Sequence, residues 1–155
     1  MMNDMILNTP KEATYRLLLA LSTWPEKEFT SRWISAMDFV AEYGAVFGIS
    51  AINLHGNNGM KFTEYIVRLD TVDQALRNMV LNGWATVSVG NLGYSYRIAY
   101  DGKQLAKSFQ TSYARLYCEA ADAAYKKYGE LTEQELDTMI NRRSVESASR
   151  EKGND

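Results

Sequence analysis

Side chains able to do acid–base or nucleophilic chemistry are scarce in this chain of 155 residues, which has one histidine, His55, and one cysteine, Cys118. An imidazole can act as a general base near neutral pH. However, no motif places a serine or cysteine nucleophile with an orienting acid beside His55. Cys118 follows Tyr117 within a stretch of helical period, where a cysteine usually packs as a small apolar residue. We therefore expect a loop histidine, a structural cysteine and no enzyme.

Metal and nucleotide sites find equally little support. One cysteine and one histidine cannot supply the ligands of an ordinary zinc site or a disulfide within the chain. Acidic residues cluster over 130–137, where the dipole of a beginning helix explains them better than a metal ion does. The glycines of segment 56–62 lack the order of a phosphate-binding loop and a preceding strand. The sequence predicts no cofactor and no metal.

DNA binding needs cations at the right places. Seventeen basic and nineteen acidic side chains give a formal net charge of -2, which disfavours coating of nucleic acid or anionic lipid. A predicted helix offers Asp73, Gln74, Arg77 and Asn78, and a predicted wing offers Arg97. Since Lys and Arg dominate the affinity for phosphate, one or two cations are too few. The sequence favours a protein-binding over a DNA-binding domain, with Arg77 and Arg97 as the candidate DNA contacts.

Capping signals and periodicity predict the helices that must position these residues. Thr9-Pro10-Lys11-Glu12 is a capping box, and the apolar stripe that follows it ends before Pro25. A second helix starts at Thr30 or the next residue and continues to Gly44. Helical period returns over 62–82, as two short helices or one bent helix, with Asp70 as a cap for the second part.

Two runs of period two follow, over 84–89 and 94–100, and Gly90-Asn91-Leu92-Gly93 joins them as a hairpin loop. Three helices followed by a two-stranded hairpin is the order of a winged helix-turn-helix domain. We therefore expect a mainly α fold with a β-hairpin wing, in which 70–82 is the recognition-type helix.

The remaining sequence predicts a helical extension. A long helix over 111–128 carries a narrow stripe of small and aromatic residues, which is typical of a close packing seam. A capping box at Thr132 opens a short last helix. The expected division is a winged-helix domain over 1–109 with a long loop at 44–61, an extension over 110–141 and a disordered tail over 142–155.

Aromatic residues, with ten tyrosines and three tryptophans, are numerous enough to suggest a protein interface. Trp24 and Trp84 lie in register with apolar stripes and are expected in the core. Trp33 lies beside a core face that is already filled, so we expect it to be exposed for a partner. The loop at 44–61 is long but apolar, so it packs on its own domain or on a partner. The candidate partner contacts are Trp33, Phe47, Leu54, His55, Tyr96, Tyr113 and Tyr117.

The expected location is the cytoplasm, without a membrane partner. The longest apolar runs, such as 17–21, are much shorter than the roughly 20 residues that span a bilayer. The first residues carry Asp4 and no Lys or Arg ahead of an apolar stretch, which is the wrong pattern for a secretory signal.

A series of short stretches, spread over the chain up to about residue 141, carries a family resemblance through its order and spacing. The stretches are Asn8-Thr9-Pro10-Lys11-Glu12, Arg16-Leu17-Leu18, Met37-Asp38-Phe39, Leu54-His55, Glu64-Tyr65-Ile66-Val67-Arg68, Asn82-Gly83-Trp84 and Gly129-Glu130-Leu131-Thr132. Together they resemble the small middle component of three-component ABC-type defence systems, the group that includes the Lamassu anti-phage and anti-plasmid systems. The chain departs from the family pattern after the Leu-His pair, where glycine and asparagine replace the usual prolines.

The resemblance implies a non-catalytic subunit between an SMC-like coiled-coil ATPase and an effector that is commonly a nuclease. It implies that this adaptor helps to hold the effector inactive until invading DNA is sensed, so that contact with DNA is mainly indirect. The alternative is a winged-helix DNA-binding transcription regulator, which would dimerise through the helix at 111–128 and contact a duplex through Arg77 and Arg97.

Overall fold

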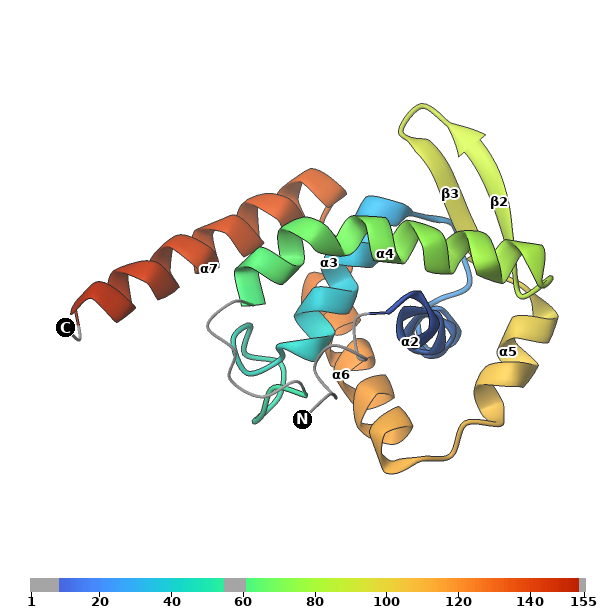
Figure 1. The fold of residues 1–155 in the computed structure, drawn as a ribbon, viewed down its shortest axis with the longest axis horizontal. Helices are drawn as coiled ribbons and strands as arrows, with labels where there is room; N and C mark the ends of the chain where they lie inside the picture. Colours follow the sequence, from blue (N-terminus) through green and yellow to red (C-terminus); the bar gives the residue numbers. More distant parts are fainter. Residues whose placement is uncertain (1–8, 55–60, 154–155) are drawn as a thin grey trace.

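The computed structural model describes residues 9–54 and 61–153, which form a mainly helical molecule with a small antiparallel sheet (Figure 1). The elements in chain order, labelled as in Figure 1, are α2 (Pro10–Thr23), β1 (Phe29–Thr30), α3 (Ser31–Glu42), α4 (Lys61–Leu81), β2 (Ala85–Gly90), β3 (Gly93–Ile98), α5 (Tyr100–Lys107), α6 (Ser112–Tyr128) and α7 (Glu133–Gly153). Among the described residues, no helix is long and apolar enough to cross a membrane.

Helix α2 is the centre of the core. It contacts α4 on one side and α5 and α6 on others, while α3 packs against α4, α6 and α7. The residues 17–21 are all buried, so this helix is apolar around most of its circumference. Such a pattern is typical of a helix that is surrounded by other elements. Trp24 at its end is buried as expected, and Trp84 is half-buried.

The predicted helix starts are confirmed by their capping hydrogen bonds. The Thr9 side chain accepts from the backbone N–H of Glu12 at 3.2 Å, and that of Thr30 accepts from Trp33 N–H at 3.2 Å. Thr132 and Glu135 form a reciprocal capping box, in which each side chain accepts from the other residue's backbone N–H. These bonds satisfy N–H groups that the first turn of a helix leaves unpaired.

Helix α4 corrects one prediction. It is a single helix of 21 residues, and Asp70 lies inside it instead of capping a second segment. The buried side chains Arg68, Val72, Leu76 and Met79 follow one another at spacings of three and four, which keeps one continuous face against α2 and α3. The polar residues between them lie on the opposite face and do not interrupt the helix.

The sheet has the order β1-β3-β2 and is antiparallel throughout. Gly90 pairs with Gly93, so the hairpin turn contains two residues instead of the predicted four. Gly93 has φ +97°, a left-handed conformation that glycine adopts at little cost. The third strand, β1, was not predicted because it has only two residues.

Helix α5 also differs from the prediction. Tyr100 begins this helix instead of ending a strand, and Asp101 and Gly102 lie within it instead of forming a turn. A Cβ atom at position 102 would lie 2.2 Å from the Trp84 carbonyl oxygen. The absence of a side chain therefore lets α5 approach the start of the hairpin closely.

Aromatic rings join the end of α2 and strand β1 to α3. Phe29 and Trp33 stack with centroids 4.4 Å apart, and Trp24 meets Trp33 edge to face at 5.2 Å. Trp33 Nε1 donates to the Leu131 carbonyl at 3.0 Å. The expectation that Trp33 is exposed was wrong. Its side chain is buried, because it packs against Phe29 and Trp24 and bonds to Leu131 in the segment between α6 and α7.

The described part of the long loop folds back on its own domain as a series of turns. Phe47 is fully buried, and its carbonyl accepts from Tyr128 Oη at 2.9 Å and Lys127 Nζ at 3.0 Å. Leu54 N–H donates to the Glu42 carbonyl at 2.8 Å. Residues 55–60, which include the candidate His55, lie outside the described residues.

Helix α7 is longer than the short last helix that the sequence predicted, and it includes residues 142–153 of the segment predicted as a tail. Leu136 and Ile140 are fully buried, and Tyr65 Oη donates to Asp137 at 2.7 Å. Beyond this docked part the helix continues to Gly153 and runs away from the other helices (Figure 1). Its second half carries few apolar residues, which is why the sequence pattern favoured a mobile tail.

Candidate protein-binding surface

A buried cluster of charges fixes helix α4, whose outer side forms part of the molecular surface. Arg16 of α2 contacts Asp38 of α3 through Nε at 3.1 Å and Nη2 at 3.2 Å. Arg68 of α4 contacts Asp38 at 2.6 Å and also pairs with Glu42. Tyr117 of α6 donates to Asp38 at 2.7 Å. Two arginines, two carboxylates and one tyrosine thereby join four helices in the interior.

The charges in this cluster determine the protonation of its members. Burial by itself would raise the pKa of Asp38, but the guanidinium groups of Arg16 and Arg68 outweigh it and hold this pKa below its ordinary value. Burial and the neighbouring Asp38 raise the pKa of the Tyr117 phenol. The carboxylate is therefore ionised and the phenol neutral at neutral pH, which are the states that this hydrogen bond requires.

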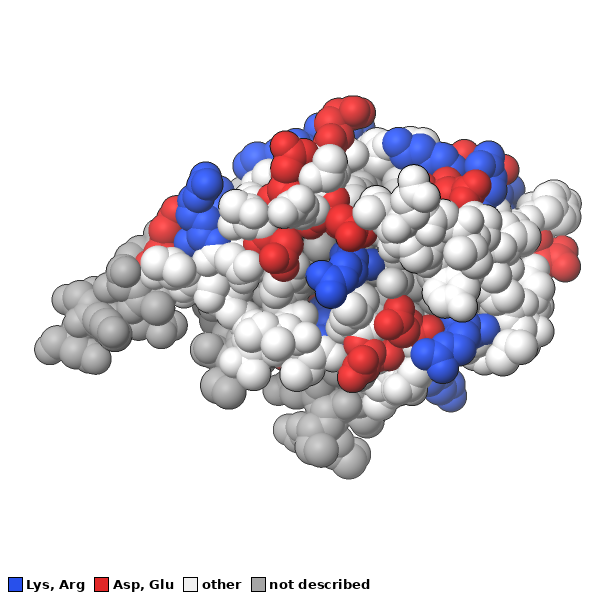
Figure 2. Space-filling model, turned by 90° about the horizontal axis from the view of Figure 1, so that it is seen from above, with Lys and Arg blue, Asp and Glu red and all other residues white. Residues whose placement is uncertain are grey.

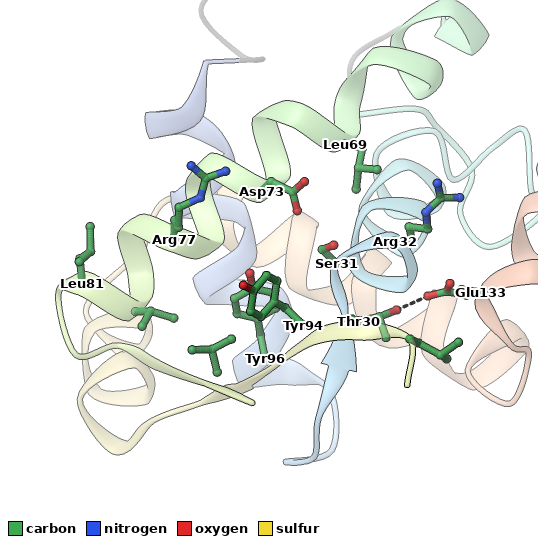
Figure 3. Close-up of a pocket in the computed structure, with 14 residues that line it drawn as sticks. Thr30, Ser31, Arg32, Leu69, Asp73, Arg77, Leu81, Tyr94, Tyr96 and Glu133 are labelled. Atoms are coloured by element: carbon green, nitrogen blue, oxygen red, sulfur yellow. Dashed lines mark hydrogen bonds between the residues drawn. The ribbon is translucent and has the colours of Figure 1, made fainter. Parts of the chain in front are cut away.

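The outer side of α4 and the hairpin enclose an open groove (Figure 3). One face of the hairpin carries the cross-strand pairs Ala85 with Ile98, Val87 with Tyr96, and Val89 with Tyr94. Ala85, Ile98 and Tyr96 are buried, whereas Val89 and Tyr94 near the turn are exposed. The apolar face of the hairpin is therefore part of the core at Ala85 and Ile98, and it is exposed near the turn.

This groove has a volume of about 710 Å³. It is lined by Thr30, Ser31, Arg32, Leu69, Asp73, Arg77, Val80, Leu81, Val87, Leu92, Gly93, Tyr94, Tyr96 and Glu133, and we call it the α4–hairpin groove. Several of its large apolar side chains are unusually exposed: Leu81 is 83% exposed, Leu92 72% and Tyr94 62%. Contiguous exposed apolar side chains with polar residues at their margin are typical of an interaction site.

The charges around the α4–hairpin groove have both signs. Arg32 and Arg77 line it together with Asp73, and none of the three forms an ion pair within the described parts of the chain. Glu133 accepts a hydrogen bond from Thr30. Figure 2 shows Lys and Arg interspersed with Asp and Glu on this side of the molecule, without a continuous basic area. A phosphate backbone would meet carboxylates as well as guanidinium groups here.

The predicted DNA contacts are not brought together. Arg77 lines the α4–hairpin groove, whereas Arg97 pairs in register with Thr86 and so lies on the opposite face of the hairpin. Arg97 Nε also lies 3.7 Å from a carboxylate oxygen of Glu26. The two cations therefore do not form one surface.

Most of the predicted partner contacts are inside the molecule. Trp33, Phe47, Tyr96 and Tyr117 are buried, so their aromatic character serves the fold. Tyr113 and Leu54 are half-buried. Among the members of the predicted set that the structure describes, Tyr96 alone lines the α4–hairpin groove.

The sequence pattern did not single out the exposed apolar residues Leu81, Val87, Leu92 and Tyr94 as contacts. A usable signal was present. Leu81 lies on the polar side of the apolar stripe of α4, two residues before Gly83, and Leu92 occupies the hairpin turn. Apolar residues at such solvent-facing positions need an explanation outside the chain's own core. Within the described residues, no three His, Cys, Asp or Glu side chains are grouped so as to hold a metal ion.

Comparison with known families gives one match. The profile described as ABC-three component (ABC-3C) system Middle Component 2 matches residues 6–150. No curated protein and no solved structure is significantly similar to the chain. The matched range includes all the helices and strands of the described residues except the last three residues of α7. It confirms the resemblance to the middle component of a three-component ABC system. The chain therefore belongs to the Middle Component 2 family of ABC-three component systems.

Proposed function

We propose that this chain is a non-catalytic adaptor that connects the two larger proteins of an ABC-three component defence complex. The observation that carries the proposal is the family match over residues 6–150, because a middle component acts with other components. The exposed apolar α4–hairpin groove supports it, since a protein that works alone rarely leaves such side chains in water.

The partners in this proposal are an SMC-like coiled-coil ATPase and an effector of the nuclease class, as in Lamassu-type systems. The adaptor helps to hold the effector inactive on the ATPase until foreign DNA is sensed. Charges of mixed sign around the α4–hairpin groove fit a role in which DNA contact is indirect.

The experiment is reconstitution with the products of the neighbouring genes. The tagged full chain is co-expressed with them, purified and weighed by mass photometry. We expect one complex that contains the chain, a coiled-coil ATPase and a second large protein. Elution of the chain by itself in the presence of the ATPase would contradict the adaptor role.

Regulation is tested on the same complex by measuring DNA cleavage with and without this chain. We expect the effector to cleave DNA in the absence of a trigger when the chain is omitted, and to be restrained when it is present. Equal cleavage in both preparations would contradict the restraint while leaving the connecting role intact.

The transcription-regulator alternative has less support. Its two candidate cations lie on different faces, and Asp73 lines the same groove as Arg77. A duplex-binding titration at low salt separates the two functions: the alternative requires affinity that falls steeply with salt and on Arg77→Ala.

A further inference from the structure

We infer that the α4–hairpin groove binds an amphipathic α-helix of a partner protein. This inference rests on the proposed adaptor function and names the surface and the kind of segment that this function uses. Four properties of the groove carry it: the backbone hydrogen bonds of its walls, the length of its α4 wall, its exposed apolar side chains and its charged side chains.

The walls of the groove offer side chains instead of free backbone groups. The groove is lined by one face of the hairpin, from which side chains project, while the backbone N–H and C=O groups of β2 and β3 lie in the plane of the sheet. The residues of α4 bond within their helix. An extended peptide would need backbone partners that such a surface does not supply. A helix satisfies its own backbone bonds, so it can lie on this surface with side chains alone.

The dimensions fit a short helix. The α4 wall extends from Leu69 to Leu81, which at about 1.5 Å per residue is a length of about 18 Å. A second helix of about twelve residues, a little over three turns, covers that length. It presents apolar side chains at spacings of three and four residues, which is the pattern that lies in apolar grooves.

The apolar anchors and the charges define the chemistry of the partner segment. Leu81, Leu92 and Tyr94 are the most exposed apolar side chains of the groove and are its sites for anchoring residues. Asp73 and Arg77 are four residues apart on the α4 wall (Figure 3). The complementary helix therefore carries an apolar stripe with a basic residue opposite Asp73 and an acidic residue opposite Arg77. The carboxylate of Asp73 makes a nucleic acid a poor occupant.

The first experiment is photo-crosslinking in the reconstituted complex. The photoreactive residue p-benzoyl-L-phenylalanine replaces Tyr94 or Leu81, and in a matched control it replaces Tyr100, which is 73% exposed and lies on α5 outside the groove. We expect crosslinks from positions 94 and 81, but not from 100, to one partner segment with apolar residues at helical spacing. A complex that forms without groove crosslinks overturns this inference and leaves the adaptor function standing, whereas failure to form any complex overturns both.

The second experiment measures affinity with the crosslinked segment as a synthetic fluorescent peptide and the full chain. We expect Leu81→Ser and Tyr94→Ser to weaken binding about tenfold or more, as truncation of anchoring residues does, and Tyr100→Ser to leave it unchanged.

Arg77→Glu should weaken binding, and exchange of the facing acidic residue in the peptide for lysine should restore it. Circular dichroism should show that the peptide becomes helical on binding. An extended bound peptide, or a random-sequence DNA duplex that binds through Arg77 in its place, would overturn the inference.

Discussion

At the scale of single residues, the buried charges decide how the helices meet. Arg16, Asp38 and Arg68 lie on three different helices, and each is at most 4% exposed. Removal of one member of a buried ion pair leaves its partner's charge without compensation, which is strongly destabilising. The three residues lie in three of the stretches that carry the family resemblance, so the motif positions without evident chemistry have a structural role.

Asp38→Asn tests this role. The substitution leaves two buried guanidinium groups with one carboxylate between them, so we expect a loss of about 3–5 kcal/mol in the free energy of unfolding. Urea unfolding followed by circular dichroism measures it. Asp122→Asn, which removes a surface pair with Lys126, is the matched control and should change stability by about 0.5 kcal/mol or less. Equal effects of the two substitutions would contradict the role of the cluster.

The same carboxyl group predicts a pH dependence. The guanidinium groups hold the pKa of Asp38 below its ordinary value of about 3.9, against the opposing effect of burial. Since the folded-state pKa is depressed, the stabilisation is complete above the unfolded pKa and is lost as the pH falls below about 4 toward the folded pKa. We expect the unfolding free energy to decrease in that window, as measured by urea titrations at several pH values.

Tyr117→Phe provides the comparison for this pH dependence. It removes one hydrogen bond to the ionised carboxylate but keeps the ring, so the variant should lose about 1.5–3 kcal/mol at neutral pH and less at low pH. An equal loss at all pH values would show that Asp38 is not the group that titrates.

At the scale of elements, close approach and docking determine where α5 and α7 lie. Gly102→Ala places a Cβ atom against the Trp84 carbonyl oxygen, at 2.2 Å if nothing moves. The Trp84 oxygen belongs to the backbone, so a side-chain rotation cannot remove the clash, and α5 or the hairpin must move. We expect a loss of about 1–3 kcal/mol in the free energy of unfolding. Gly90→Ala, with no atom within 4 Å of the new Cβ, should be nearly neutral. Chemical denaturation of both variants checks this.

Helix α7 provides a second prediction at this scale. Ile140 is fully buried where α7 packs on α3, whereas Val145 is 66% exposed one turn beyond. We therefore expect Ile140→Ala to cost about 2–5 kcal/mol and Val145→Ala less than about 0.5 kcal/mol. Thermal and urea unfolding of the pair measure the difference. A large effect of Val145→Ala would contradict the exposed position of the second half of α7.

At the scale of the whole molecule, the structure predicts one cooperative unit instead of a domain followed by an extension. Helix α6 packs on α2 and α3, and Trp24 Nε1 donates to the Ala121 carbonyl at 3.0 Å. We expect backbone amides of α2 and α6 to exchange through the same global opening in native-state hydrogen exchange. Earlier exchange of the whole segment 112–128 would favour the boundary at 109 that the sequence suggested.

The sequence by itself determined the helix starts that carry a threonine cap, the presence of the hairpin and the family. The Thr9 and Thr132 caps act within a few residues, and a period of two or 3.6 is visible in any one segment. The tertiary structure decided which aromatic residues are buried, because Trp33 and Tyr117 meet partners about 80–100 residues away. It also decided the pairing of β1 with β3 and the α4–hairpin groove. Burial and groove formation depend on which distant elements meet, and local periodicity contains no information about that.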